Sequence, residues 1–183
     1  MREDNAAKPV LVLTGGPAAG KSATALALSD STPRCAFIDV DDIRQLVKTG
    51  GAAPWEGEEG LRQQALGVRN ACALAKSFTK HGFAAIVADV LTPETARLYR
   101  RLLPDVVLVH LTLSREEARR RASLRPMHIT SEEFEALHEV QVADPPRVDV
   151  SLEVTSMSPA EQVEAVRDLW VSRCYTPTSA GPR

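Results

Sequence analysis

The chain reads Gly15-Gly16-Pro17-Ala18-Ala19-Gly20-Lys21-Ser22 just beyond an apolar segment, Val10–Leu13. This run matches the phosphate-binding pattern G-x-x-x-x-G-K-[ST] at every required position. A buried strand that ends in such a loop and continues into a helix points backbone N–H groups and the helix N-terminus at an anion. The glycines allow close approach, Lys21 can reach β- and γ-phosphates, and the Ser22 hydroxyl can bind Mg²⁺. The stretch therefore predicts a site for a nucleoside triphosphate.

The composition is that of an ordinary globular protein. With 183 residues, 44% hydrophobic and 25% charged, the chain has the size of one α/β domain. We expect a single domain over residues 1–183, with flexible ends at 1–8 and 175–183. No apolar run approaches the roughly 18 residues of a membrane span, and residues 1–8 lack the features of a secretory signal, so we expect a cytoplasmic location. The formal net charge of −2 gives no general attraction to nucleic acid.

Apolar runs and helical patterns alternate along the chain. Buried strands are predicted at Val10–Leu13, Cys35–Val40, Phe83–Ala88, Val106–Leu113 and Val148–Val154. Helices are predicted at Lys21–Ser29, Asp42–Lys48, Glu58–His81, Pro93–Leu103, Arg115–Leu124, Ser131–Val140 and Pro159–Arg173. This alternation predicts an α/β fold with a five-stranded parallel sheet, helices on both faces, and a site at the carboxyl ends of the strands.

Three acids and an arginine crowd the end of the second predicted strand. A carboxylate at this place can accept a proton from a substrate hydroxyl that attacks the γ-phosphate, and we assign this role to Asp41. Asp42 also suits the first turn of the next helix, and Asp39 suits a role as a Mg²⁺ or hydrogen-bonding partner. Alternatively, all three acids only cap and solvate the turn. Arg44 shares a helical face with Asp41, so it is either a contact for an anionic or polyhydroxyl substrate or a surface arginine.

Three further residues outside the phosphate loop are candidates for metal or substrate binding. Asp89 closes the third apolar run, where it either holds the water shell of Mg²⁺ and orients the substrate or serves as a turn residue. Trp55 and Arg62 are candidates for the wall of an acceptor pocket, although Trp55 suits packing equally well. The segment Thr155–Pro159 has the residues of a helix start, and its backbone lies where the edge of an adenine ring would fit, although helix capping alone explains every residue.

A cluster of arginines follows the fourth predicted strand. Arg121 and Arg125 are four residues apart, so one helical face can direct both guanidinium groups toward the same phosphate oxygens. Pro126 then interrupts the helix, which favours a hinged segment that closes over the nucleotide. The alternative is an exposed helix in which glutamates pair with arginines at helical spacing: Glu116 and Glu117 with Arg120 and Arg121.

Taken together, the phosphate loop, the segment Val40–Arg44, Asp89 and the two arginines resemble the small P-loop kinases that include chloramphenicol phosphotransferase, zeta toxins and the kinase domain of polynucleotide kinases. The resemblance spans Val10 to about Arg173. It implies a P-loop NTPase fold of the nucleoside-kinase type with an arginine-bearing lid, and it implies ATP and Mg²⁺ as cofactors. It also implies that Asp41 is the general base, Arg44 contacts the substrate, and Arg121 and Arg125 belong to the lid.

The predicted site residues fall into four sets. The catalytic set is Asp41, Lys21, Arg121 and Arg125. The nucleotide set is Gly15, Gly16, Pro17, Ala18, Ala19, Gly20, Lys21, Ser22, Thr24 and Arg121. The metal set is Ser22, Asp39 and Asp89. The substrate set is Asp41, Arg44, Trp55, Arg62 and Asp89.

These observations favour an ATP-dependent O-phosphotransferase that acts on a hydroxyl of a small molecule. By resemblance, the most specific version is an antibiotic-inactivating enzyme with a nucleoside or chloramphenicol-type acceptor. The alternatives are a kinase of a metabolite, a nucleotide sugar or a polynucleotide end, and a non-catalytic ATP-binding switch protein. Asp41 beside a complete phosphate loop favours chemistry over switching. We expect no membrane partner and no nucleic acid, since no basic, aromatic-interleaved surface is seen beyond the lid; a homodimer is left open.

Overall fold

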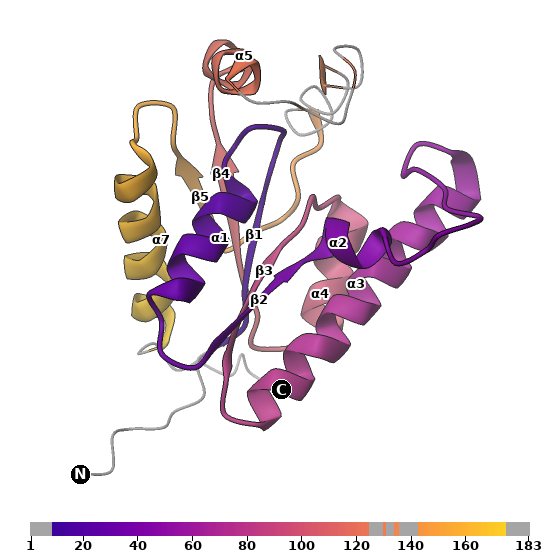
Figure 1. The fold of residues 1–183 in the computed structure, drawn as a ribbon, viewed down its shortest axis with the longest axis horizontal. Helices are drawn as coiled ribbons and strands as arrows, with labels where there is room; N and C mark the ends of the chain where they lie inside the picture. Colours follow the sequence, from indigo (N-terminus) through magenta and orange to yellow (C-terminus); the bar gives the residue numbers. More distant parts are fainter. Residues whose placement is uncertain (1–8, 125–129, 131–133, 136–142, 175–183) are drawn as a thin grey trace, which may run out of the picture.

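The structure is a computed structural model that describes residues 9–124, 130, 134–135 and 143–174. Its strands and helices alternate as the sequence predicts (Figure 1). The strands are β1 (Leu11–Gly15), β2 (Cys35–Asp39), β3 (Ala84–Ala88), β4 (Val107–Thr112) and β5 (Val150–Glu153). The helices are α1 (Lys21–Asp30), α2 (Val40–Arg44), α3 (Gly57–Lys80), α4 (Pro93–Leu102), α5 (Arg115–Ser123) and α7 (Pro159–Cys174).

The five strands form one parallel sheet in the order β2-β3-β1-β4-β5. Helices α1 and α7 cover one face of this sheet, and α3 and α4 cover the other (Figure 1). A parallel sheet buried on both faces needs strands that are apolar throughout, and β1 is fully buried along its length. The predicted fold class is therefore confirmed for the described residues.

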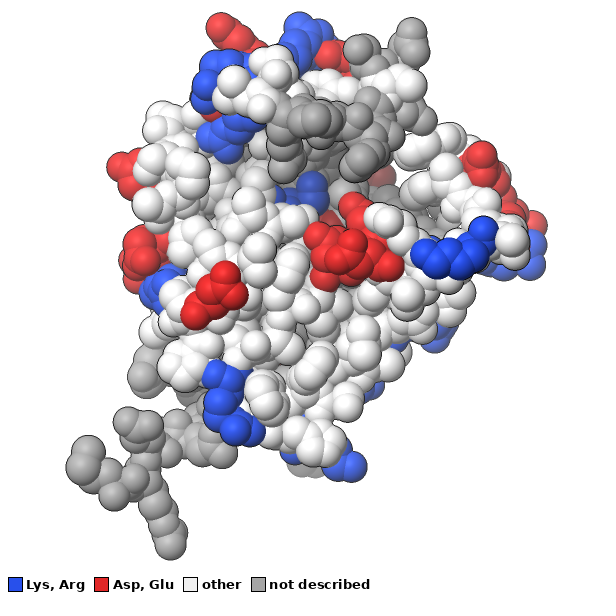
Figure 2. Space-filling model, viewed as in Figure 1, with Lys and Arg blue, Asp and Glu red and all other residues white. Residues whose placement is uncertain are grey.

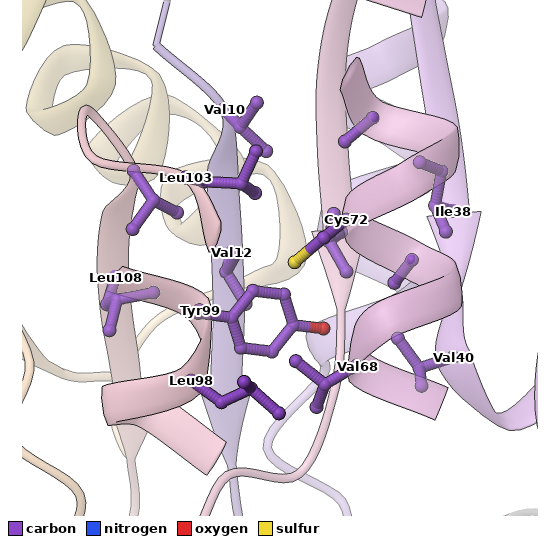
Figure 3. Packing of buried hydrophobic residues seen from close by; sticks show 14 of the residues in the cluster. Val10, Val12, Ile38, Val40, Val68, Cys72, Leu98, Tyr99, Leu103 and Leu108 are labelled. Carbon is purple, nitrogen blue, oxygen red and sulfur yellow. The ribbon is translucent and has the colours of Figure 1, made fainter. Parts of the chain in front are cut away.

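Two apolar layers hold the helices against the sheet. The layer beneath α3 and α4 contains Val12, Val68 and Tyr99, which pack side by side around Cys72 (Figure 3). The layer beneath α1 and α7 includes Trp170, which is 1% exposed and donates its indole N–H to the carbonyl of Pro9 at 2.8 Å. Burying a large aromatic side chain with its polar atom paired contributes stability without an unsatisfied donor. The two layers pack against the two faces of the sheet at the central strand β1.

The order of the strands places the loop after β1 at a switch point. β1 pairs with β3 on one side and with β4 on the other. The chain runs from β1 toward the β2 edge of the sheet and later crosses from β3 to β4 toward the other edge, so the direction of the connections reverses around β1. Residues 16–20 form this loop, and α1 begins at Lys21. The carboxyl end of β1 is consequently the point in the sheet at which a bound anion meets both a backbone loop and a helix N-terminus.

The predicted bounds of one helix differ clearly from the structure, while those of the other described elements differ by a few residues at most. The helix expected at Asp42–Lys48 is α2, which begins directly after β2 and ends at Arg44. It starts early because the Asp39 carboxylate accepts a hydrogen bond from the Asp41 N–H at 3.0 Å, which caps the first turn. Asp41 therefore lies in the first turn of a short helix.

Several sequence predictions fall on residues that the structure does not describe. They are the flexible ends at 1–8 and 175–183, nearly all of the helix at Ser131–Val140, and Arg125. Within the described part of the chain, none of the helices combines the length and the apolar character needed to cross a lipid bilayer.

The end of β1 generates a stability prediction. Gly15 has φ +147°, and a Cβ at this position would lie 2.3 Å from the carbonyl oxygen of Leu111 on β4. The substitution Gly15→Ala therefore forces two paired strands apart, and we expect it to lower the free energy of unfolding by about 2 to 4 kcal/mol. Gly51→Ala is the control, because nothing lies within 4 Å of its added Cβ. Denaturant titration measures both, and equal stability of the two variants would contradict the strand contact.

Candidate active site

The phosphate loop holds a conformation that suits an anion. Ala18 and Gly20 both have positive φ values, 60° and 87°, which turn the backbone back on itself between β1 and α1. The Lys21 ammonium donates to the carbonyl of Gly16 at 3.0 Å and so lies along the loop. A loop that turns in this way directs several backbone N–H groups into one concavity. This is the arrangement that binds phosphate.

A buried glutamine that the sequence analysis missed holds this loop in place. Gln162 on α7 is 3% exposed, and its amide Nε2 donates to the carbonyl of Ala19 at 3.0 Å and to the hydroxyl of Thr24 at 2.8 Å. The Thr24 hydroxyl, predicted to bind nucleotide, therefore accepts a hydrogen bond from α7. Glycine suits position 20 because its φ is +87° and because an added Cβ would lie 2.9 Å from Nε2, which would force the Gln162 amide to shift. No local pattern identifies Gln162, because its partners are distant in the sequence.

A cavity of about 530 Å³ adjoins the phosphate loop. Ala23 and Ala27 of α1 form one wall, Met157 and Pro159 form another, and Arg121 of α5 borders the opening. The volume lies in the range of small-molecule sites, and the apolar walls suit the flat faces of a base. Met157, Ser158 and Pro159 of the segment Thr155–Pro159 line this cavity, and the adenine edge expected at this segment stays a prediction. Ser158 and Pro159 also begin α7, as predicted, with the Ser158 hydroxyl accepting from the Glu161 N–H.

Arg121 ties α5 to the wall of this cavity. Its Nη2 donates to the carbonyls of Val154 at 2.8 Å and Met157 at 3.3 Å, while its Nε pairs with Glu117 at 2.7 Å. Glu117 also pairs with Arg120 at 2.6 Å. The predicted glutamate–arginine pairs are therefore present for Glu117, whereas the alternative interpretation, a segment that closes over the nucleotide, stays a prediction. The contact of Arg121 with a phosphate stays a prediction.

The acidic residues at the end of β2 and in the first turn of α2 lie in the middle of the face drawn in Figure 2. Asp39 caps the helix, Asp42 is exposed, and the side chain of Asp41 is 67% exposed with one oxygen, Oδ1, 2.8 Å from Nη1 of Arg44. Arg44 reaches back with Nη2 to Asp89, also at 2.8 Å. Because the Asp89 N–H donates to the carbonyl of Leu13 in β1, this chain of contacts links Asp41, across β3, to the strand that leads into the phosphate loop.

Asp89 is a buried carboxylate whose two oxygens are already engaged. Oδ1 accepts from Arg44 and from the N–H of Val90 at 2.8 Å, and Oδ2 accepts from the Tyr99 hydroxyl at 3.0 Å. Burial raises the pKa of Asp89, although Arg44, Tyr99 and Val90 act to lower it. The sequence predicted Asp89 as a metal and substrate residue; the structure places it beneath Arg44.

The fit to Mg²⁺ differs among the three predicted ligands. The Ser22 side chain is exposed in the first turn of α1, beside the phosphate concavity. Asp39 uses one oxygen to cap α2, and Asp89 has both oxygens engaged. Among the residues that the structure describes, no group of three or more His, Cys, Asp and Glu side chains could hold a metal ion. Ser22 is thus the described residue that fits direct contact with a Mg²⁺ carried in on the nucleotide.

Trp55 and Arg62 lie away from Asp41's contacts. Trp55 is 55% exposed in the connection between α2 and α3, and Arg62 is held on α3 by Glu58 and Glu59 at 3.6 and 3.4 Å. A second cavity, of about 300 Å³, lies between α2 and α3 and is lined by Arg44, but neither Trp55 nor Arg62 borders it. The predicted acceptor wall formed by these two residues stays a prediction.

Gln162 provides a test of the preformed loop. The substitution Gln162→Leu keeps the size of the side chain but leaves the Ala19 carbonyl without its donor, so we expect a loss of about 1 to 3 kcal/mol in stability. ATP affinity should fall roughly tenfold, equivalent to about 1.4 kcal/mol, because the loop must then be ordered by the ligand. Calorimetric titration measures the affinity.

The matched control is Gln63→Leu. Gln63 also bridges a loop, accepting from the Ala52 N–H and donating to the carbonyl of Gly50, both at 2.8 Å. This loop borders the second cavity, which shares no lining residue with the cavity beside the phosphate loop, so the loss of these hydrogen bonds should leave ATP affinity unchanged. An equal loss of affinity in both variants would mean that Gln162 acts through general destabilisation.

The lowered pKa of Glu117 predicts how the ion pairs within α5 depend on pH. Hydrogen bonds from Arg120 and Arg121 lower this pKa from 4.5 to about 2. A lowered folded-state pKa contributes stability that is complete above the unfolded value and is lost as pH falls from 4.5 toward 2. The free energy of unfolding of Glu117→Gln should therefore vary less over this acidic window than that of the unaltered protein. Identical pH profiles would contradict these ion pairs.

Three comparisons with known proteins concern the family and the fold of this chain. The family model of chloramphenicol phosphotransferase-like proteins matches residues 8–171. Comparison with curated proteins gives no match. Among solved structures, a sugar kinase from Janibacter sp. HTCC2649 is 16% identical, with a TM-score of 0.68 over 90% of this chain and 95% of that one. Shikimate kinase from Acinetobacter baumannii in complex with shikimate is 20% identical, with a TM-score of 0.66 over 92% and 96%.

A third solved structure extends the same fold. The APS kinase CysC of Mycobacterium tuberculosis, as a Cys556Ala mutant (its own numbering), is 18% identical, with a TM-score of 0.58 over 88% of this chain and 96% of that one. At these identities the structures show the fold, and the family match identifies the relatives. The chain thus belongs to the chloramphenicol phosphotransferase-like family of small P-loop kinases.

Proposed function

We propose that this protein is an ATP-dependent O-phosphotransferase that transfers the γ-phosphoryl group to a hydroxyl of a small molecule. The observation that carries the proposal is the position of Asp41. Its exposed carboxylate lies in the first turn of α2 and connects through Arg44 and Asp89 to the strand that enters the phosphate loop. A protein that only binds ATP has no need of a solvent-facing carboxylate at this place.

The proposed reaction uses the residues on the two sides of the loop. ATP occupies the phosphate loop with its base in the cavity between α1, α5 and α7. Asp41 accepts the proton from the acceptor hydroxyl as its oxygen attacks the γ-phosphorus. Lys21 holds the β- and γ-phosphates, and Arg121 and Arg125 stabilise the charge that develops on the transferred group. Ser22 would hold the Mg²⁺ that accompanies the nucleotide, and this ion would supply positive charge near the phosphates.

The acceptor that we propose is an antibiotic of the nucleoside or chloramphenicol type, and the reaction would inactivate it. The family description names chloramphenicol phosphotransferase, which supports this class. A metabolite kinase is the second candidate, because the similar structures include a sugar kinase and a shikimate kinase. We propose no nucleic-acid or membrane partner for either version.

The test measures ADP release with chloramphenicol and with uridine as acceptors, and then with shikimate and glucose. The substitution Asp41→Asn should lower kcat by about 10² to 10⁴, with ATP affinity nearly intact, because the carboxylate serves the acceptor.

Lys21→Ala should abolish transfer, since its ammonium is the principal side-chain charge on the β- and γ-phosphates.

Asp42→Asn is the matched control, because it removes a neighbouring exposed charge on the same short helix. It should keep near-normal kcat. If Asp42→Asn is inactive and Asp41→Asn is not, the base lies one residue further along. ADP release that no acceptor accelerates would contradict transfer to these hydroxyls.

A further inference from the structure

Tyr99, Asp89 and Arg44 form a connected set of side chains that the proposed reaction does not yet use. Asp89 has a side chain with no exposed surface, a costly place for a carboxylate. It is satisfied there by three donors: the Tyr99 hydroxyl, the Val90 N–H and Arg44 Nη2. Burying a charge with this many partners couples the positions of all of them.

Tyr99 is a fixed member of this set. It is fully buried in the layer under α4, with its hydroxyl pointing across the core toward the side of Val68 and Cys72 (Figure 3). Burial and the nearby Asp89 raise the pKa of Tyr99 well above its usual value, so the phenol keeps its proton and donates. The ring cannot leave without emptying the core, and Asp89 Oδ2 is thereby tied to a rigid element.

Arg44 links the buried Asp89 to the exposed Asp41. Its Nη2 binds Asp89 and its Nη1 binds Asp41, both at 2.8 Å, so one planar guanidinium spans a buried and an exposed carboxylate. An exposed ion pair between two flexible side chains orders little. Here the arginine is held from beneath, and because its fork is rigid, fixing one nitrogen fixes the other.

The neighbouring helix leaves room for this arrangement. Gly67 of α3 faces Arg44, and a Cβ on it would lie 3.2 Å from Arg44 Nε and 3.2 Å from Cγ1 of Val40. A larger residue would press on the guanidinium stem and on the first residue of α2. Glycine at this position is consistent with close packing of α3 against the arginine.

We propose that Arg44, Asp89 and Tyr99 act as positioning residues for Asp41, and we call these three residues the Asp41 anchor. Asp41 Oδ1 is held by Arg44, while Oδ2 accepts no hydrogen bond from the residues that the structure describes. The anchor thus orients one carboxylate oxygen and leaves the other to take the acceptor proton. This inference rests on the proposed function, because the orientation of Asp41 matters only if Asp41 accepts a proton. The contacts that form the anchor are present without an acceptor.

The first test needs no acceptor. In ¹³C-labelled protein at constant pH, Tyr99→Phe removes one hydroxyl that does not touch Asp41. The carboxyl carbon resonance of Asp41 should shift in this variant, and shift further in Arg44→Lys, which can hold only one carboxylate at a time. The control is Arg97→Lys, because Arg97 also pairs with an acid three residues away, Glu94, on the exposed face of α4. An Asp41 resonance that stays unchanged in both test variants would overturn the proposal.

The second test is kinetic. With an acceptor that the protein phosphorylates, Arg44→Lys should lower kcat about 10- to 100-fold, with the acceptor KM within about twofold, because misplacing a reacting group costs rate. In the Asp41→Asn background the same change should have almost no further effect, since the residue to be positioned is already inactive. Equal losses in both backgrounds, or a raised KM with unchanged kcat, would mean that Arg44 binds the substrate itself and would overturn the anchor.

The two tests separate the two proposals. A shifted Asp41 resonance without transfer to any tested acceptor supports the Asp41 anchor and contradicts the proposed function. Transfer with an unshifted resonance supports the function and contradicts the anchor. Thermal unfolding of each variant shows that the chain remains folded, and Tyr99→Phe keeps the ring that packs the core.

Discussion

The close approach of β1 to β4 at Gly15 is the constraint on which the site depends. The Gly15 backbone lies against the carbonyl of Leu111, where no side chain fits. Only with this packing does the chain leave the sheet at its centre, between β3 and β4, and turn into α1. The same turn needs positive φ values at Ala18 and Gly20, and α7 supports it through Gln162. The anion site is thus a property of the whole central sheet.

The two ends of the site differ in charge. Beside the first cavity, α5 carries arginines that pair with Glu117, and Arg121 donates to the carbonyls of Val154 and Met157. At the other end, α2 exposes acids, with Arg44 linking Asp41 to the buried Asp89, and acidic side chains gather in the middle of the face drawn in Figure 2. A positive side suits phosphate and a negative side suits a proton acceptor, so this division of charge suits the phosphoryl transfer that we propose.

Much of this could be predicted because the signals are local. The phosphate loop is a continuous run, the strands are apolar runs of a buried parallel sheet, and the Ser158 cap is a short pattern. Gln162 could not be predicted, since the residues that it binds lie 143 and 138 positions away. The partners of Asp89 could not be predicted for the same reason. The sequence indicates an acid at a strand end, but Tyr99 and Arg44 reach it only through the packing of α2, α3 and α4.

The sequence by itself determined the order of strands and helices, the phosphate-binding loop and the acids that follow β2, because each depends on residues that are neighbours in the chain. The tertiary structure decided which carboxylates are exposed and which are buried. Asp41 and Asp89 both follow strands, yet one faces solvent and the other lies beneath Arg44 with both oxygens occupied. Burial depends on what α3 and α4 place over the strand ends, and that arrangement exists only when the helices pack on the sheet.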